Sequence, residues 1–193
     1  MRVTRLLDAP IITPSLHPSI GQNIQGPSLI RVPDWVPVRM GTYYLYFADH
    51  KGSYIRLAYA DDLFGPWKVH PPGSLQLADS HFLTEAPEAP VDAVEEIRIR
   101  RESSRGPDKL SHDLLTELTT PHIASPDVHV DSQNQTIVMY FHGLQALGYQ
   151  VTRLATSTDG IRFAARPGIL GRSYFRTFTY DGYTYAMGMP GQF

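Results

Sequence analysis

One short segment gathers the side chains best suited to chemistry. The run from Ala124 to Asp131 reads Ala-Ser-Pro-Asp-Val-His-Val-Asp, and two further histidines lie close to it in sequence. Residues two apart share one face of a β-strand, so Asp127, His129 and Asp131 are expected on the same side. The polar residues of this segment and its surroundings are His122, Ser125, Asp127, His129, Asp131 and His142.

Asp127 is the strongest candidate for a chemical role. It lies at the start of the predicted strand, the preceding proline fixes the backbone, and a buried carboxylate needs either partners or a function. Asp131 precedes the polar turn Ser-Gln-Asn-Gln and is interpreted as a turn acceptor. His129 on a buried strand has two readings, a satisfied core histidine or a ligand-binding group.

Repeated strand patterns predict the elements that position these residues. Short runs rich in β-branched and aromatic residues, bounded by Gly, Pro or Asp, occur at 28–32, 43–48, 54–60 and 67–70. The same pattern returns at 124–131, 136–142, 151–157 and 161–165. Tyr140 lies 94 residues after Tyr46, and a third copy begins near Tyr174.

Four antiparallel strands in about 45 residues is the size of one β-propeller blade. The expected fold class is therefore all-β: an incomplete propeller of about two and a half four-stranded blades. A single domain over 1–193 is expected, with blade one at 26–70, a partly helical insertion at 71–121, blade two at 122–168 and part of blade three at 169–193. Within the insertion, 84–106 is expected to be the least ordered part, and leucine spacing predicts a helix around 109–118.

Composition narrows the classes of function. The formal net charge of −2 gives no basic footprint for nucleic acid, and the absence of cysteine excludes a disulfide framework and thiolate metal sites. No apolar run is nearly long enough to span a membrane. The apolar stretch at the N-terminus is too short for a signal peptide. We expect a cytoplasmic protein with no cofactor, no metal, no nucleic-acid partner and no membrane partner. An incomplete start would hide a leader, and the sequence leaves the oligomeric state open.

The repeated motifs resemble the five-bladed propeller glycoside hydrolases, the superfamily that includes families 32, 43, 62 and 68. The resemblance rests on the Gly-Pro-Ser-Leu-Ile start at Gly26, the strand leading to Gly65-Pro66-Trp67, and the segments 125–131 and 157–160. It covers residues 20–70 and 122–193 and implies a carbohydrate ligand. It also implies a carboxylate base or nucleophile in blade one, an Asp in blade two and a Glu acid in blade three.

This chain departs from that pattern at each carboxylate position, which we call a slot. The slots hold Gly26, Ser125 and the segment Arg172-Ser173-Tyr174. Asp127 and Asp34 are the nearby carboxylates and the candidate catalytic pair. The candidate sugar-binding residues are His50, Lys51, His122, Ser125, His129, His142, Arg31, Arg172 and Arg176.

Three functions remain open at this point. In order of preference, they are a glycosidase, a carbohydrate-binding propeller without catalysis, and a structural or interaction propeller. Because five blades need roughly 250–300 residues at about 45–50 each, we expect this chain to be the N-terminal part of a longer protein, and inactive by itself.

Overall fold

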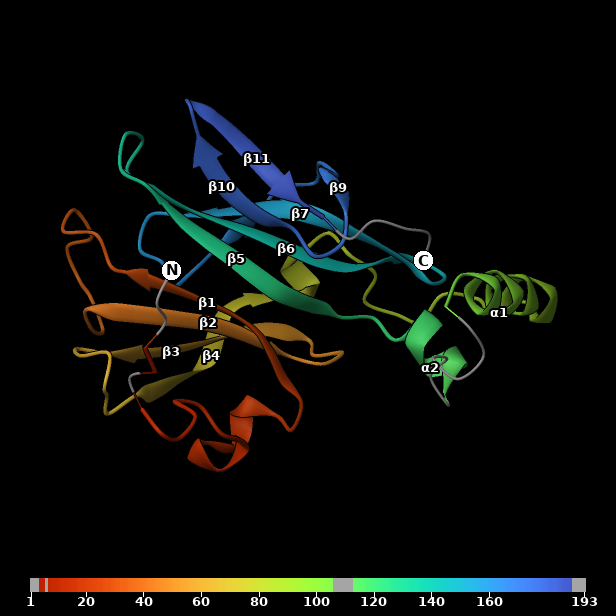
Figure 1. Cartoon of the computed structure of the whole chain (residues 1–193), viewed down its shortest axis with the longest axis horizontal. Coiled ribbons are helices and arrows are strands. Elements are labelled where there is room, and N and C mark those ends of the chain that lie inside the picture. The colour runs from red at the N-terminus through yellow and green to blue at the C-terminus, as the bar shows by residue number, and fades with distance from the viewer. Residues whose placement is uncertain (1–3, 6, 106–112, 189–193) are drawn as a thin grey trace.

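The computed structural model describes residues 4–5, 7–105 and 113–188, and it is built mainly from antiparallel β-sheets (Figure 1). The first sheet contains β1 (Ile24–Arg31), β2 (Tyr43–Asp49), β3 (Tyr54–Ala60) and β4 (Lys68–Gln76) in sequential order. The second contains β5 (Ile123–Asp131), β6 (Thr136–Ala146), β7 (Tyr149–Ser157) and β8 (Ala164–Ala165), with β9 (Gly171–Arg172) paired to β7. The expected succession of antiparallel sheets is thus confirmed.

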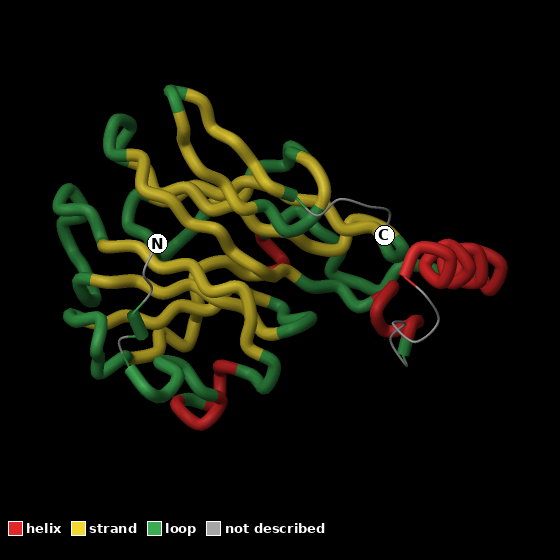
Figure 2. Tube along the Cα trace, in the orientation of Figure 1, coloured by secondary structure: helices red, strands yellow, loops and turns green. Residues whose placement is uncertain are grey.

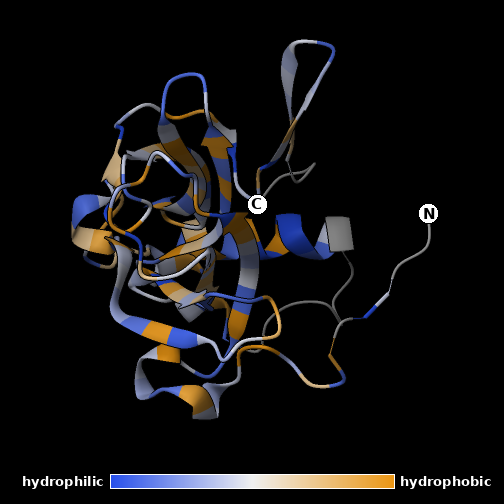
Figure 3. Ribbon diagram, turned by 90° about the vertical axis from the view of Figure 1, so that its left-hand side faces the viewer, coloured by the Kyte–Doolittle hydropathy of each residue, from blue (hydrophilic) through white to orange (hydrophobic). Residues whose placement is uncertain are grey.

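A two-stranded hairpin follows the second sheet. It consists of β10 (Arg176–Tyr180) and β11 (Tyr183–Met187), joined at Asp181 and Gly182. Figure 3 shows its tip standing clear of the rest of the molecule. One face of the hairpin carries threonines and the other carries large apolar side chains, because successive residues of a strand point to opposite sides.

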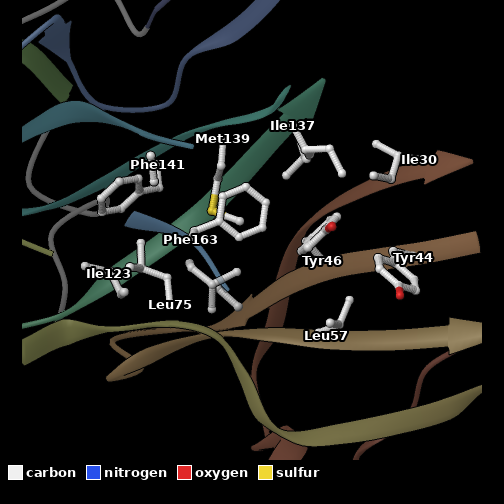
Figure 4. Packing of buried hydrophobic residues seen from close by; sticks show 14 of the residues in the cluster. Ile30, Tyr44, Tyr46, Leu57, Leu75, Ile123, Ile137, Met139, Phe141 and Phe163 are labelled. Carbon is white, nitrogen blue, oxygen red and sulfur yellow. The ribbon is translucent and has the colours of Figure 1, made fainter. Parts of the chain in front are cut away.

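The two sheets pack face to face around the main core (Figure 4). Ile30, Tyr44 and Tyr46 of the first sheet meet Ile137 and Met139 of the second, and all five are buried. The Tyr46 hydroxyl donates to the carbonyl oxygen of Gly160 at 2.7 Å, so the buried phenol keeps a partner. Burial of each such side chain stabilises the fold by about 1.5–3 kcal/mol.

The N-terminal segment covers the other face of the first sheet. Its two short 3₁₀ helices, Pro14–Leu16 and Pro18–Ile20, each begin with a proline, whose fixed φ suits a first helical position. Ile20 is fully buried and clusters with Phe47 and Trp67. This face of the sheet is therefore closed by the chain itself.

The connection between the sheets differs from the expectation. Residues 84–106 were expected to be the least ordered part, but α1 (Val91–Arg105) forms there (Figure 2). Its mixed charges pair along the helix surface: Arg98 binds Glu95 and Glu102, and Arg100 binds Glu96 at 2.6 Å. Opposite charges three and four residues apart favour a helix, so the charge run that looked like loop is a solvated helix.

A second helix, α2 (Leu114–Thr119), overlaps the range 109–118 that was predicted to be helical. Asp113 caps it by accepting a hydrogen bond from the Thr116 amide at 3.0 Å. The earlier part of the predicted helix, 109–112, lies outside the described residues. No helix in the described ranges is long and apolar enough to cross a membrane.

Candidate functional site

The three slots share one feature of the backbone. In β1 and in β5 the pairing with the next strand is interrupted at the slot, between Gln25 and Ser28 and between Ala124 and Asp127. Gly26 has φ +62°, Ser125 has φ +48°, and Tyr174, just before β10, has φ +64°. The left-handed backbone recurs at all three positions, and at Gly26 and Ser125 it lies within a bulge of the first strand of a sheet. The third slot is therefore Tyr174.

The first two slots touch. β1 and β5 run side by side (Figure 1), and a Cβ atom built on Gly26 would lie 2.5 Å from Ser125 Cα and 3.0 Å from Ser125 Oγ. Real Cβ atoms do not approach other atoms this closely. Residue 26 therefore has no room for an aspartate while Ser125 keeps this position.

A hydrogen bond of the same kind joins β5 to β1 and β10 to β5, shortly after the slots. The Val128 amide of β5 donates to Ser28 Oγ of β1 at 2.8 Å. The Thr177 amide of β10 donates to Asp127 Oδ2 of β5 at 2.7 Å. Ser28 and Asp127 are equivalent, because each is the first paired residue after the bulge. Asp127 thus performs the linking role that Ser28 performs one sheet earlier.

Asp127 has further partners around the same carboxylate. His129 Nε2 lies 2.8 Å from Oδ2, the Thr177 hydroxyl lies 3.1 Å from Oδ2, and Arg176 Nη1 lies 3.6 Å from Oδ1. Burial acts to raise the pKa of Asp127, but the hydrogen bonds from His129 and Thr177 outweigh it and lower the pKa below its usual value. Asp127 is therefore a carboxylate, not an acid, at neutral pH.

The same geometry argues against an activated threonine nucleophile. His129 Nε2 contacts both Asp127 Oδ2 and the Thr177 hydroxyl, each at 2.8 Å. A carboxylate only accepts, so Nε2 carries the proton that it donates to Asp127. A base must offer a free ring nitrogen to the hydroxyl it deprotonates, and here the ring nitrogen facing Thr177 is already protonated.

A second group of predicted residues lies at the end of the two sheets where their first strands, β1 and β5, begin. We call this end of the molecule the entrance face. The turn between β2 and β3 reaches it, since the His50 amide donates to Asn23 O and the Ile123 amide donates to Gly52 O. His50 Nε2 and Lys51 Nζ lie 3.1 and 3.4 Å from the carboxylate of Glu117 in α2. Burial lowers the pKa of Lys51, although the Glu117 carboxylate acts to raise it.

His122 and His142 lie buried behind this ion pair. Burial lowers the pKa of His122 to about 4 and that of His142 to about 3, with nearby Lys51 adding to both shifts, so both rings are neutral. His122 Nδ1 lies 2.7 Å from Thr120 O, and since a carbonyl only accepts, Nδ1 carries the proton. The Tyr174 ring lies 4.3 Å from the His142 ring.

Two buried polar atoms near Tyr174 have no hydrogen-bond partner within the described part of the chain. They are His142 Nδ1 and Ser173 Oγ, on residues that are 2 % and 0 % exposed. Buried polar atoms are normally paired, so each invites a water molecule or a ligand group. Ser173 directly precedes Tyr174 in the chain, and the His142 ring packs against the Tyr174 ring.

The structure does not bring the remaining candidates into these groups. Asp34 follows the far end of β1, where its carboxylate is 79 % exposed and pairs with Arg39 at 3.1 Å. At about 3.3 Å per strand residue, the end of β1 lies more than about 15 Å from Gly26. Arg31 is exposed at that same end of β1, and Arg172 is exposed in β9.

The structure adds Thr177 and Glu117 to the site residues considered from sequence. The third repeat placed a strand near Thr177, but the amide that binds Asp127 becomes visible only when β5 and β10 are side by side. Glu117 lies on a helix recognised by its leucines, and no sequence signal pointed it toward Lys51. Among the described residues, no group of three or more His, Asp or Glu side chains is placed to hold a metal ion.

Comparisons with known proteins give two distant matches. No family model matches the chain. A protein of Acanthamoeba polyphaga mimivirus, described as uncharacterized, is 33% identical over 180 residues, covering 88% of this chain and 43% of the viral protein. An α-L-arabinofuranosidase structure from Clostridium thermocellum is similar with TM-score 0.49 and 14% identity, covering 86% of this chain and 42% of the enzyme. The chain spans less than half the length of either protein.

Proposed function

We propose that this protein binds carbohydrate at its entrance face and does not cleave it. The observation that carries the proposal is the equivalence of Gly26, Ser125 and Tyr174, which have the same left-handed backbone at the entry to three inner strands. The shared backbone conformation supports treating these three positions as equivalent, and none of them carries a carboxylate.

The available carboxylates also argue against hydrolysis. Glycosidases hold two carboxyl groups about 5 Å or about 6.5–9.5 Å apart, one of them protonated. Asp127 has a lowered pKa and is engaged by β10, whereas Asp34 is exposed beyond the far end of β1. Gly26 has no space for a replacement side chain. An acid and a base facing one bond are therefore not assembled from these residues.

The chemistry of the entrance face supports sugar binding. Tyr174 offers an aromatic ring that packs on the buried, neutral His142. Within the described residues, His142 Nδ1 and Ser173 Oγ beside it have no hydrogen-bond partner. Sites for small polar ligands combine apolar surface with a few placed polar groups. The five-bladed arrangement, with blades at 26–70, 122–168 and from 169, is part of this proposal and is supported by the threefold repeat of the slot.

The test combines binding and turnover on the same sample. Arabinose, xylose, galactose and fructose oligosaccharides are titrated by calorimetry, and the corresponding aryl glycosides are assayed for release of the chromophore. We expect millimolar or tighter binding of one of these sugars, weakened in Tyr174→Ala, with no release above a heat-treated control. Tyr185→Ala, on the exposed face of β11, is the matched control.

Two results would overturn the proposal. Release of the chromophore by wild-type protein, lost in Asp127→Asn, would make it a glycosidase. The absence of binding to every sugar tested would leave the interaction or structural reading as the better account of the fold.

A further inference from the structure

A groove of ≈ 500 Å³ lies away from the entrance face, between the far end of β5 and the β10–β11 hairpin. None of the three slot residues lines it. Its walls come from the last residues of β5, the turn after it, β6 and the hairpin. The lining residues are His129, Val130, Asp131, Ser132, Gln133, Val138, Tyr140, Thr177, Phe178, Thr179 and Thr184.

Threonine hydroxyls form the hairpin wall. Thr179 and Thr184 are directly paired across the two strands, and Thr177 lies two residues before Thr179. Residues opposite each other, and residues two apart on one strand, share a face. This face therefore presents the hydroxyls of Thr179 and Thr184 to the groove, whereas the Thr177 hydroxyl is already bonded to Asp127 and His129. The aromatic side chains of Tyr183 and Tyr185 belong to the other face.

The opposite wall is fixed in place before any ligand arrives. His129 is held through Nε2 by Asp127 and Thr177, and its ring meets the Tyr140 ring at 6.1 Å. Asp131 is held by Asn134, whose amide and side chain donate to it at 3.0 and 2.7 Å. Polar groups held by such contacts lose little freedom on binding, which favours affinity.

Charge limits what the groove accepts. Among the described residues, no lysine or arginine lines the groove, and Arg176 nearby is directed to Pro126 O at 2.8 Å and to Asp127. An anion placed there would face Asp131 with no cation to compensate. The hydroxyls, amide and imidazole suit a neutral partner with many hydroxyl groups, and Tyr140 supplies an apolar surface beside them.

We propose that the groove between β5 and the β10–β11 hairpin is a separate binding site for a neutral polyhydroxylated ligand of saccharide type. Its volume lies within the range of about 300–1,000 Å³ typical of small-molecule sites. The groove is separate from the entrance face, so a test of the groove does not decide the function proposed above.

The test uses Thr179→Val and Thr184→Val, which keep the shape and the β-preference of the side chains and remove only the hydroxyls. Maltose, cellobiose and xylobiose serve as neutral probes, with glucuronic acid as the anionic counterpart, and binding is followed by NMR of the assigned amides. Tyr185→Phe, on the other face of the same hairpin, is the matched control. Ser125→Ala and Tyr174→Ala report on the entrance face.

We expect a neutral probe to shift the amides of residues 129–133 and 177–184, and each valine variant to weaken its binding roughly 2- to 10-fold. Tyr185→Phe and the entrance variants should leave these shifts unchanged. The proposal is wrong if no neutral probe shifts these amides, if the valine variants bind as wild type does, or if glucuronic acid binds better than the neutral sugars. Loss of binding in Tyr174→Ala alone would support the entrance face and not the groove.

Discussion

The backbone amide of Thr177 donates to the carboxylate of Asp127 at 2.7 Å, one sheet after Val128 donates in the same way to Ser28 at 2.8 Å. A link that is a hydroxyl in one repeat is a carboxylate in the next. The repeat therefore gives Asp127 a structural role that requires no ligand. The loss of folding stability when its charge is removed can be measured.

Replacing Asp127 by Asn is expected to destabilise the protein by about 1–3 kcal/mol, because the amide cannot accept every hydrogen bond that Oδ2 accepts now. The free energy of unfolding in urea at pH 7 measures the effect. Asp34→Asn is the control, and the loss of its exposed ion pair should cost about 0–1 kcal/mol. Equal effects of the two changes would contradict the linking role.

The contribution of Asp127 to the stability of the fold should also depend on pH. Its folded pKa is lowered, so its stabilising contribution is fully present above the unfolded value of about 3.9 and is lost as the pH falls through the folded value. Wild type should therefore lose stability below about pH 4 more steeply than Asp127→Asn. Parallel stability curves for the two proteins in this range would show that the carboxylate is not held as described.

The buried histidines predict a second pH effect in a different window. His122 and His142 have folded pKa values of about 4 and about 3, whereas an unfolded histidine titrates near about 6.5. Below about pH 6.5 the unfolded chain takes up protons that the folded chain does not, so stability falls with pH until the folded values are reached. His142→Gln should flatten the decline between pH 6.5 and 5 in urea unfolding. An unchanged slope would mean that His142 is charged or exposed.

Two glycines separate the effect of crowding from that of backbone conformation. Gly26 and Gly182 have φ +62° and +76°, but a Cβ at Gly182 meets nothing within 4 Å, whereas one at Gly26 meets Ser125. Gly182→Ala should cost about 1–2 kcal/mol from the left-handed backbone alone. Gly26→Ala should cost at least about 1 kcal/mol more, measured by thermal and urea unfolding. Equal costs would show that β1 and β5 separate easily at this point.

Glu117 is predicted to hold α2 against the β2–β3 turn. Its carboxylate accepts from His50 at 3.1 Å and faces the largely buried Lys51 at 3.4 Å. Glu117→Ala leaves Lys51 near two neutral histidines without its counter-charge, so amide hydrogen exchange in 114–119 should speed up. Glu96→Ala, on the exposed surface of α1, is the control and should change exchange only locally.

Sequence pattern predicted the sheets better than it predicted the site. The β-branched and aromatic runs located the strands because pairing and burial act on each strand locally, as at Tyr43–Asp49. The helix Val91–Arg105 was missed, because its charges show order only when taken at three- and four-residue spacing.

Some of the candidate residues lie together in the structure. Asp127, His129 and Arg176 come together, as do His50 and Lys51, because each set lies on strands or turns that the repeat brings to one place. Asp34 does not join Asp127, because it follows the end of β1 opposite to Gly26 and a strand rises about 3.3 Å per residue. The left-handed backbone at Ser125 and Tyr174 had no signal in composition, since neither residue prefers it.

The contact between Gly26 and Ser125 limits the order in which this protein can change over evolutionary time. A mutation that adds a side chain at 26 is harmful on the present background, whatever that side chain offers chemically. It becomes tolerable only after β5 has moved away from β1, because the closest atom is the backbone Cα of Ser125, which any residue at 125 would keep. A lineage with Gly at 26 is therefore expected to gain a carboxylate there only after a change that shifts these two strands apart.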